Sequence, residues 1–240
     1  MQLLLFIFNL LCGIPAGHNS NMPLPDPCEA ARAGAAVATL TAQDSIFVTA
    51  LINIKNAYKA DANEHCISLG KNAAGTILAS APARGSTSSG KVPYIPNAFA
   101  DLHNHPNNLP PDAGDFYGLV NMVKNNPHYT TRFVITTNGT LYALLVTDTA
   151  ALQTFLRRYP PQSPAFTGGP KGFSVAITDE AREMKYAQQC SDEMVLAFIL
   201  DKYNTGVCLL KQNGRGVFNK IITTVSSSGN QLLYHAATCL

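Results

Sequence analysis

Helical spacing of apolar residues, or an Ala-rich composition, marks five segments of the chain that we expect to form helices. In the second of them Phe47, Leu51 and Ile54 recur on one face, and either Thr41 or Ser45 can cap its start. The predicted helices cover residues 28–40, 41–58, 112–125, 149–158 and 179–203.

Strand-like patterns mark eight shorter segments. The best-defined pair flanks Asn138-Gly139, a dipeptide that accepts the positive φ angles of a two-residue type I′ hairpin turn. Helices and strands alternate along most of the chain, so the pattern predicts an α/β protein that ends in a helix and a small antiparallel β tail. The predicted strands cover residues 64–69, 76–80, 98–103, 131–137, 140–147, 207–211, 217–225 and 232–237.

Composition divides the chain into five parts. Residues 159–173 hold four Pro and three Gly, which makes them the clearest internal linker. They separate a predicted domain at residues 41–158 from a helix and β-strand extension at residues 174–240. Residues 18–40 form a Pro- and Asn-rich connector and a helix, and residues 1–17 form a leader.

The leader predicts an exported protein. Residues 3–12 read LLLFIFNLLC, too short to cross a hydrocarbon core of about 30 Å but typical of a signal-peptide core, and the small residues Ala16 and Gly17 follow. A short buried helix is the alternative, because no Lys or Arg precedes the apolar run. A lipid anchor at Cys12 is the one membrane attachment left open, although Leu11 stands where a small residue is expected.

The charge of the chain bears on its binding partners, and the cysteine content bears on its metal and redox sites. Charged residues make up 13% of the chain, about half of the usual fraction, and the net charge is only +2, so we expect no nucleic-acid partner. Five cysteines follow the leader without a CxxC pair, so the sequence supports neither a zinc ribbon nor a thioredoxin-like site. One or two disulfides and buried free thiols both remain open.

The candidate chemistry lies in residues 101–115, DLHNHPNNLPPDAGD. His103 and His105 stand two apart at the end of a predicted strand, so their side chains face one way and can share a metal ion. A carboxylate from the start of the next helix would be the third ligand, which leaves a zinc ion one open position for water. The alternative is structural, with Asp112 as helix N-cap and Asp115 completing a capping box.

These motifs resemble the JAMM/MPN (JAB-domain) metallopeptidases, including the RadC-like branch that shares the string HNHP. The family pattern is a glutamate on an early strand, His-x-His-Pro, a short loop and Ser-x-x-Asp at a helix start. The resemblance covers about residues 41–158 and implies a mixed β-sheet flanked by helices. It also implies a zinc-dependent hydrolase that cleaves amide or isopeptide bonds in a peptide or protein-conjugate substrate.

The resemblance assigns roles to individual residues. It implies that His103, His105 and Asp115 bind Zn²⁺ and that Glu64, in EHCISLG, is the general base. Asp112 occupies the position of the motif serine, and the spacing from histidine to aspartate is one residue shorter than usual. An ionised Asp112 cannot donate a hydrogen bond to an oxyanion, so the expected alternatives are another donor, a weak enzyme or a zinc-binding module without turnover.

Several alternatives stay open at this point. Asn107 or Asn108 could supply the missing donor, and Asp112 could bind the metal in place of Asp115. A PHP-type or amidohydrolase barrel needs more downstream histidines than the chain has. A thiol hydrolase similar to the NlpC/P60 peptidases would use Cys66 with His103. His65 or His128 could assist the site, but we expect both to be surface residues.

Overall fold

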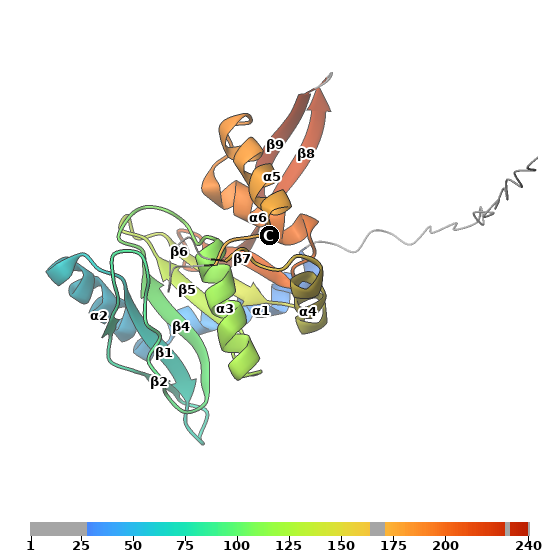
Figure 1. Ribbon diagram of the computed structural model, residues 1–240. Coiled ribbons are helices and arrows are strands. Elements are labelled where there is room, and N and C mark those ends of the chain that lie inside the picture. The colour runs from blue at the N-terminus through green and yellow to red at the C-terminus, as the bar shows by residue number, and fades with distance from the viewer. Residues whose placement is uncertain (1–27, 164–170, 229–230, 240) are drawn as a thin grey trace, which may run out of the picture.

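The computed structural model describes residues 28–163, 171–228 and 231–239, so the predictions for residues 1–27, including the leader and Cys12, lie outside it. The described residues form an α/β protein with one mixed sheet flanked by helices (Figure 1). The helices are α1 (Glu29–Gln43), α2 (Ser45–Asp61), α3 (Ala113–Asn125), α4 (Thr149–Arg158), α5 (Val175–Tyr186) and α6 (Asp192–Lys202). The strands are β1 (His65–Lys71), β2 (Ile77–Ala79), β3 (Ala83–Arg84), β4 (Ala98–Asn104), β5 (Thr131–Ile135), β6 (Leu141–Val146), β7 (Val207–Gln212), β8 (Phe218–Ser228) and β9 (Gln231–Thr238).

The sheet is mixed: it contains one parallel pair of strands, and the other pairs in the described residues are antiparallel. Its strand order over the described residues is β2-β1-β4-β5-β6-β7-β8-β9, with β3 paired to β1. Strands β4 and β5 run parallel, whereas β1 runs antiparallel to β4. The carboxyl ends of β4 and β5 therefore meet the amino end of β1 at one edge of the sheet, and the candidate site lies there.

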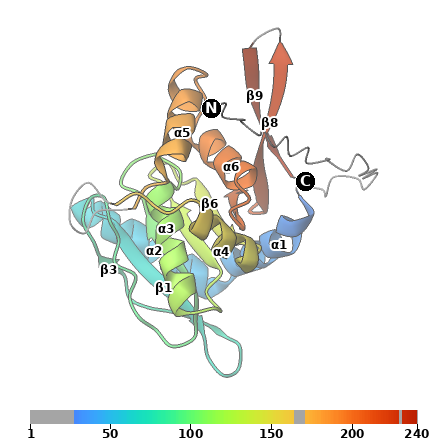
Figure 2. The same cartoon turned by 45° about the vertical axis from the view of Figure 1, so that its right-hand side comes forward.

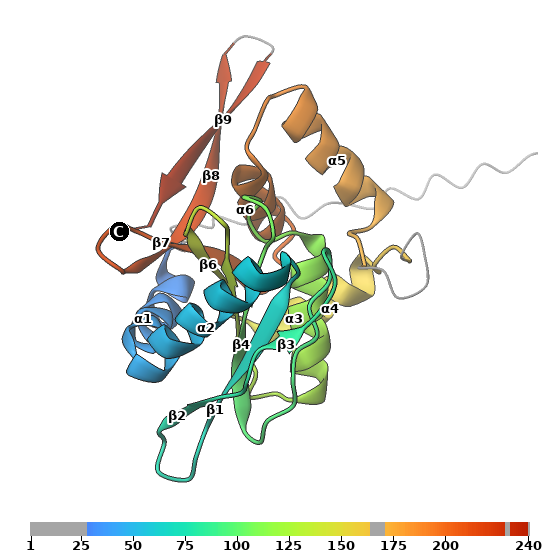
Figure 3. The ribbon, with the colours of Figure 1, turned by 90° about the vertical axis from the view of Figure 1, so that its left-hand side faces the viewer.

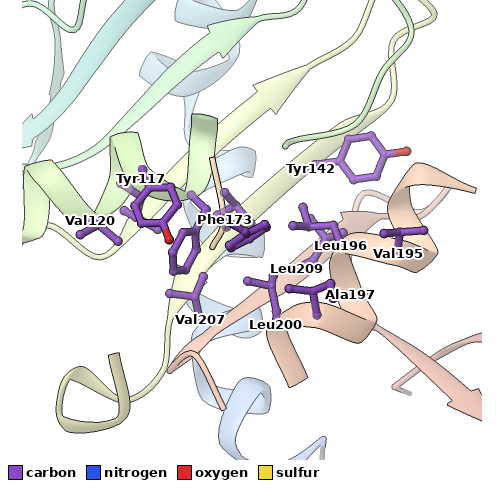
Figure 4. Packing of buried hydrophobic residues seen from close by; sticks show 14 of the residues in the cluster. Tyr117, Val120, Tyr142, Phe173, Val195, Leu196, Ala197, Leu200, Val207 and Leu209 are labelled. Atoms are coloured by element: carbon purple, nitrogen blue, oxygen red, sulfur yellow. The ribbon is translucent and has the colours of Figure 1, made fainter. Parts of the chain in front are cut away.

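Two hydrophobic clusters cover the two faces of the sheet. Helices α1 and α2 lie on one face, and α3 and α4 lie on the other (Figures 2 and 3). Strand β4 serves both faces by alternation, since Leu102 joins the α1/α2 cluster while His103 points toward α3. Figure 4 shows Phe173 packed near Tyr117 of α3 within the cluster on the α3/α4 face, to which Leu200 of α6 also belongs.

Helices α1 and α2 are anchored to the sheet by small and aromatic side chains. Phe47 of α2 packs edge-on against Phe133 of β5 with ring centroids 4.9 Å apart. Asp44 caps α2 by accepting a hydrogen bond from the N–H of Ile46, so the cap is neither Thr41 nor Ser45. Among the described residues no single helix is long and apolar enough to span a membrane, although α1 and α2, bent by 71°, meet the length and composition criteria as a pair.

One helix predicted from the sequence is divided in two in the structure. The segment predicted as one helix at residues 179–203 forms α5 and α6, because Gln189 takes a left-handed φ of 53° and Ser191 caps a new helix. The hairpin around Asn138-Gly139 is confirmed, since β5 and β6 pair antiparallel, but its predicted turn type is wrong: Gly139 has a positive φ of 86°, whereas Asn138 does not, and a type I′ turn needs both. Strand β7, from the part of the chain predicted as a C-terminal extension, pairs directly with β6 of the predicted domain at residues 41–158.

One disulfide joins the two ends of the described chain. Cys28, directly before α1, is bonded to Cys239, which follows β9. The remaining thiols in the described residues are free and buried, at Cys66, Cys190 and Cys208. Both outcomes left open for the cysteines are thus present in one molecule.

Candidate metal centre

The structure brings His103, His105 and Asp115 together. His103 comes from β4, His105 follows that strand, and Asp115 stands in the first turn of α3. His103 Nε2 lies 2.9 Å from Asp115 Oδ1, and His105 Nε2 lies 3.2 Å from Asp115 Oδ2. The two Nε2 atoms are 3.4 Å apart, and the three side chains are all buried. One ligand atom from each of the three lies within 4.8 Å of the other two, so this group can hold a metal ion.

The hydrogen bonds of His105 test whether a cation fits. Its Nδ1 lies 2.9 Å from the carbonyl oxygen of Leu109, which can only accept, so Nδ1 carries a proton. In the neutral imidazole Nε2 then presents a lone pair toward the carboxylate of Asp115, and two electron-rich atoms at that distance need a cation between them. A proton or a metal ion satisfies this need, and the donor set of two imidazoles and one carboxylate fits a divalent metal.

The pKa values of this group point the same way. Burial lowers the pKa of His105, but the carboxylate of Asp115 outweighs it and raises the pKa to about 9. Burial raises the pKa of Asp115, yet the nearby His103 and the hydrogen bonds from both imidazoles hold it well below its usual range. The pocket between these side chains therefore favours positive charge.

Asp112 occupies the cap position that the structural alternative predicts. Its Oδ1 accepts hydrogen bonds from the N–H groups of Gly114 at 2.7 Å and Asp115 at 3.2 Å. Asp115 Oδ2 in turn accepts from the N–H of Asp112 at 3.0 Å, which completes a capping box. Asp115 is thus both a cap residue and a member of the metal-ligand group, and Asp112 is not in that group.

Glu64 lies directly before β1 and is buried. Its N–H donates to the carbonyl of Ser86, and its own carbonyl accepts from the N–H of Gly85, both at 2.8 Å. Burial raises the pKa of its carboxyl group, while the imidazoles of His103 and His105 oppose that shift through their charge. A carboxyl group held in this environment suits proton transfer better than a solvated glutamate does.

Asn104 connects the two halves of the site, a role that the sequence analysis missed. It stands between the two histidines, but strand alternation sends its side chain to the opposite face. There its Oδ1 accepts from the N–H of His65 at 2.8 Å, and its Nδ2 donates to the carbonyl of Asn63 at 3.0 Å. These bonds bracket Glu64, so Asn104 ties the backbone of Glu64 to the strand that carries the histidines.

A buried ion pair lies behind Asp115, and sequence reasoning missed it too. Arg132 of β5 bonds Asp101 of β4 through Nη2 and Oδ2 at 2.8 Å and through Nε and Oδ1 at 3.2 Å. Its Nη1 also donates to the carbonyl oxygen of Asp115 at 3.4 Å. Burial lowers the pKa of Arg132, but the carboxylates of Asp101 and Asp115 raise it further, so the guanidinium stays charged.

Other predicted residues take different places. His65 is buried rather than on the surface, with Nδ1 bonded to the carbonyl of Asn63, whereas His128 is exposed as expected. The side-chain oxygens of Asn107 and Asn108 accept hydrogen bonds within the loop and from the β5–β6 turn. Each oxygen therefore holds the loop in shape, while the NH₂ groups, which are the donors of these side chains, are not used in these bonds, so the predicted donor role of Asn107 or Asn108 stays a prediction.

Cys66 is placed beside His103 but not as a nucleophile. The two residues are register partners across β1 and β4. Burial raises the pKa of the Cys66 thiol well above its usual value, which disfavours the thiolate. Gly90 lies so close that a Cβ there would be 2.2 Å from Cys66 Sγ, so the loop covers the sulfur. This geometry argues against the thiol-hydrolase alternative.

Comparisons with known proteins add no family to this picture. No family model matches the chain, and no curated protein or solved structure matches it. The JAMM/MPN resemblance therefore stays a prediction based on the motif residues of this chain.

Proposed function

We propose that the protein is a zinc-dependent hydrolase of amide or isopeptide bonds, a JAMM-like metallopeptidase. The observation that carries this proposal is the buried convergence of His103, His105 and Asp115, whose charges act on the buried carboxyl group of Glu64. Two nitrogen donors and one oxygen donor suit zinc, and such a set leaves a coordination position for chemistry. The same three residues in a merely structural cluster would not need a buried proton carrier beside them.

The chain's own residues would divide the work of hydrolysis. His103, His105 and Asp115 hold the ion, and Asp112 and Leu109 orient two of these ligands through backbone and cap hydrogen bonds. The ion, when bound, polarises the substrate carbonyl and lowers the pKa of a water molecule. Glu64 takes a proton from the attacking water at its carboxylate and passes it to the nitrogen of the leaving amine.

Asp112 favours a second candidate, a zinc-binding or protein-interaction module with weak turnover or none. Its Oδ1 is committed to the amides at the start of α3, and an ionised carboxylate beside a developing oxyanion would oppose it. The two candidates share the metal site and differ only in catalysis.

Export fits either candidate, although the leader itself lies outside the described residues. The Cys28–Cys239 disulfide is typical of an oxidising compartment, which supports an exported protein. We propose a peptide or protein conjugate as the substrate, and a net charge of +2 gives no reason to invoke nucleic acid.

Metal content is the first test. The full chain, purified without chelators, should hold one zinc ion, His103→Ala/His105→Ala should hold none, and His128→Ala should behave as the wild type because that residue is exposed. Wild-type protein without stoichiometric zinc would exclude the proposal.

Cleavage separates the two candidates. Glu64→Gln should keep its zinc and lose cleavage of a peptide library that the wild type cleaves. Zinc binding without cleavage by either protein would leave the binding module.

A further inference from the structure

A cavity of about 240 Å³ lies on the α2 side of the same sheet edge. It opens between the second half of α2 and the carboxyl ends of β4 and β5, and the turn that follows β5 closes it. His105 lines this cavity and is also a member of the metal-ligand group. The cavity and the metal-ligand group thus meet at His105, with the cavity on the α2 side of β4 and Asp115 on the α3 side.

The cavity is lined by basic side chains and by no acidic ones. Lys55 and Lys59, one turn apart on α2, both line it, and no carboxylate does. Within the described part of the chain neither ammonium group has an ion-pair or hydrogen-bond partner, and both residues are exposed. Like charges four residues apart on a helix repel each other, so an anion between them would be stabilised by both.

The turn adds a donor to the two lysines. Asn138 lines the cavity, and its Oδ1 accepts from the hydroxyl of Thr136 at 2.6 Å and from the N–H of Thr140 at 3.1 Å. With its oxygen so used, the NH₂ group of Asn138 has no acceptor in the described residues and can donate to a ligand. The turn is fixed in place because the N–H of Asn138 donates to Asn108 Oδ1 at 2.8 Å.

We propose that this cavity is a subsite for a carboxylate group of an acidic peptide substrate. Lys55, Lys59 and Asn138 bind this carboxylate. The proposal rests on the proposed hydrolase function and names the class of substrate. A carboxylate offers two acceptor oxygens to these donors, and its position next to His105 places an Asp or Glu side chain, or a chain terminus, near the bond to be cleaved.

A binding experiment tests the subsite without relying on cleavage. The zinc-loaded full chain, labelled with ¹⁵N, is titrated with N-acetylglutamate while the amide signals of Thr137 and Gly139 are followed. We expect saturable shifts in the wild type and about tenfold weaker binding in Lys55→Gln/Lys59→Gln, since two exposed charge contacts are lost. The matched control, Lys91→Gln/Lys124→Gln, removes two other exposed lysines and should bind as the wild type does.

Two results of this titration would overturn the proposal. One is equal binding by the two double variants. The other is tighter binding of inorganic phosphate than of N-acetylglutamate, which would assign the cavity to a phosphate ligand instead.

Cleavage of a peptide library then separates this proposal from the hydrolase itself. Wild-type cleavage sites should carry Asp or Glu at one fixed distance from the cleaved bond, and Lys55→Gln/Lys59→Gln should keep zinc and cleavage but lose that preference. Cleavage with no acidic preference would overturn the subsite and keep the hydrolase. Absence of wild-type cleavage, with N-acetylglutamate still bound, would overturn the hydrolase and leave only an anion-binding cavity.

Discussion

The guanidinium group of Arg132 occupies the space that a side chain at residue 118 would need. A Cβ built on Gly118 of α3 would lie 1.9 Å from Arg132 Nη1. The missing side chain lets the buried guanidinium reach both Asp101 on β4 and the carbonyl of Asp115 on α3. The helix that carries Asp115 is thereby bonded to β4, the strand that carries His103 and leads into His105.

Gly118→Ala should weaken both stability and metal binding. The added methyl group must displace Arg132, and strain of this kind costs about 1–3 kcal/mol. Urea unfolding and zinc titration of the same sample measure the two effects. Gly214→Ala is the matched control, because a Cβ there meets nothing within 4 Å. If Gly118→Ala bound zinc as tightly as the wild type, Arg132 would have no part in positioning Asp115.

Asn104→Ala should impair catalysis more than metal binding. The substitution leaves the N–H of His65 and the carbonyl of Asn63 without their partners and frees the backbone around Glu64. We expect kcat to fall at least about tenfold, the equivalent of about 1.4 kcal/mol, with zinc affinity within about threefold of wild type. Parallel loss of zinc would mean that Asn104 holds the histidines rather than Glu64. Asn125→Ala, which removes an exposed helix-surface amide, serves as the control.

Reduction should destabilise the protein strongly. The Cys28–Cys239 bond closes a loop with a sequence separation of 211 residues, and a crosslink of this kind stabilises by about 2–5 kcal/mol through the unfolded state. Denaturant unfolding with and without dithiothreitol measures the difference. Cys28→Ser/Cys239→Ser should match the reduced wild type and should not respond to dithiothreitol. A response in that variant would implicate another thiol.

Acid should remove the contribution of Asp61. A hydrogen bond from the backbone of Asn63 lowers the pKa of this carboxyl group to about 2, and Arg84 adds to the effect. The folded state thus prefers the ionised form, so the stabilisation is present above the usual pKa near 3.8 and is lost as the pH falls toward about 2. The stability difference between wild type and Asp61→Asn should shrink over this interval. A difference that stays constant from pH 6 to about pH 2.5 would contradict this linkage.

Local patterns predicted the parts of the molecule whose causes are local. His103 and His105 share a face because alternate residues of a strand do so, and Asp112 caps α3 because its side chain can reach the first free amides. The break between α5 and α6 was missed because no Gly or Pro interrupts residues 179–203, although Ser191 offered a cap signal. The pairing of β7 with β6 and the Arg132–Asp101 ion pair connect distant segments, and no local pattern encodes them.

The capping box has a consequence for how metal reaches the site. Asp115 Oδ2 is already bonded to the N–H of Asp112, and His105 Nδ1 is already bonded to Leu109, so folding orders two of the three ligands before any ion arrives. The conformational entropy of arranging those ligands is lost at folding rather than at metal capture. An ion would therefore bind to and leave this group without a change in the fold, whereas a zinc finger needs its metal in order to fold.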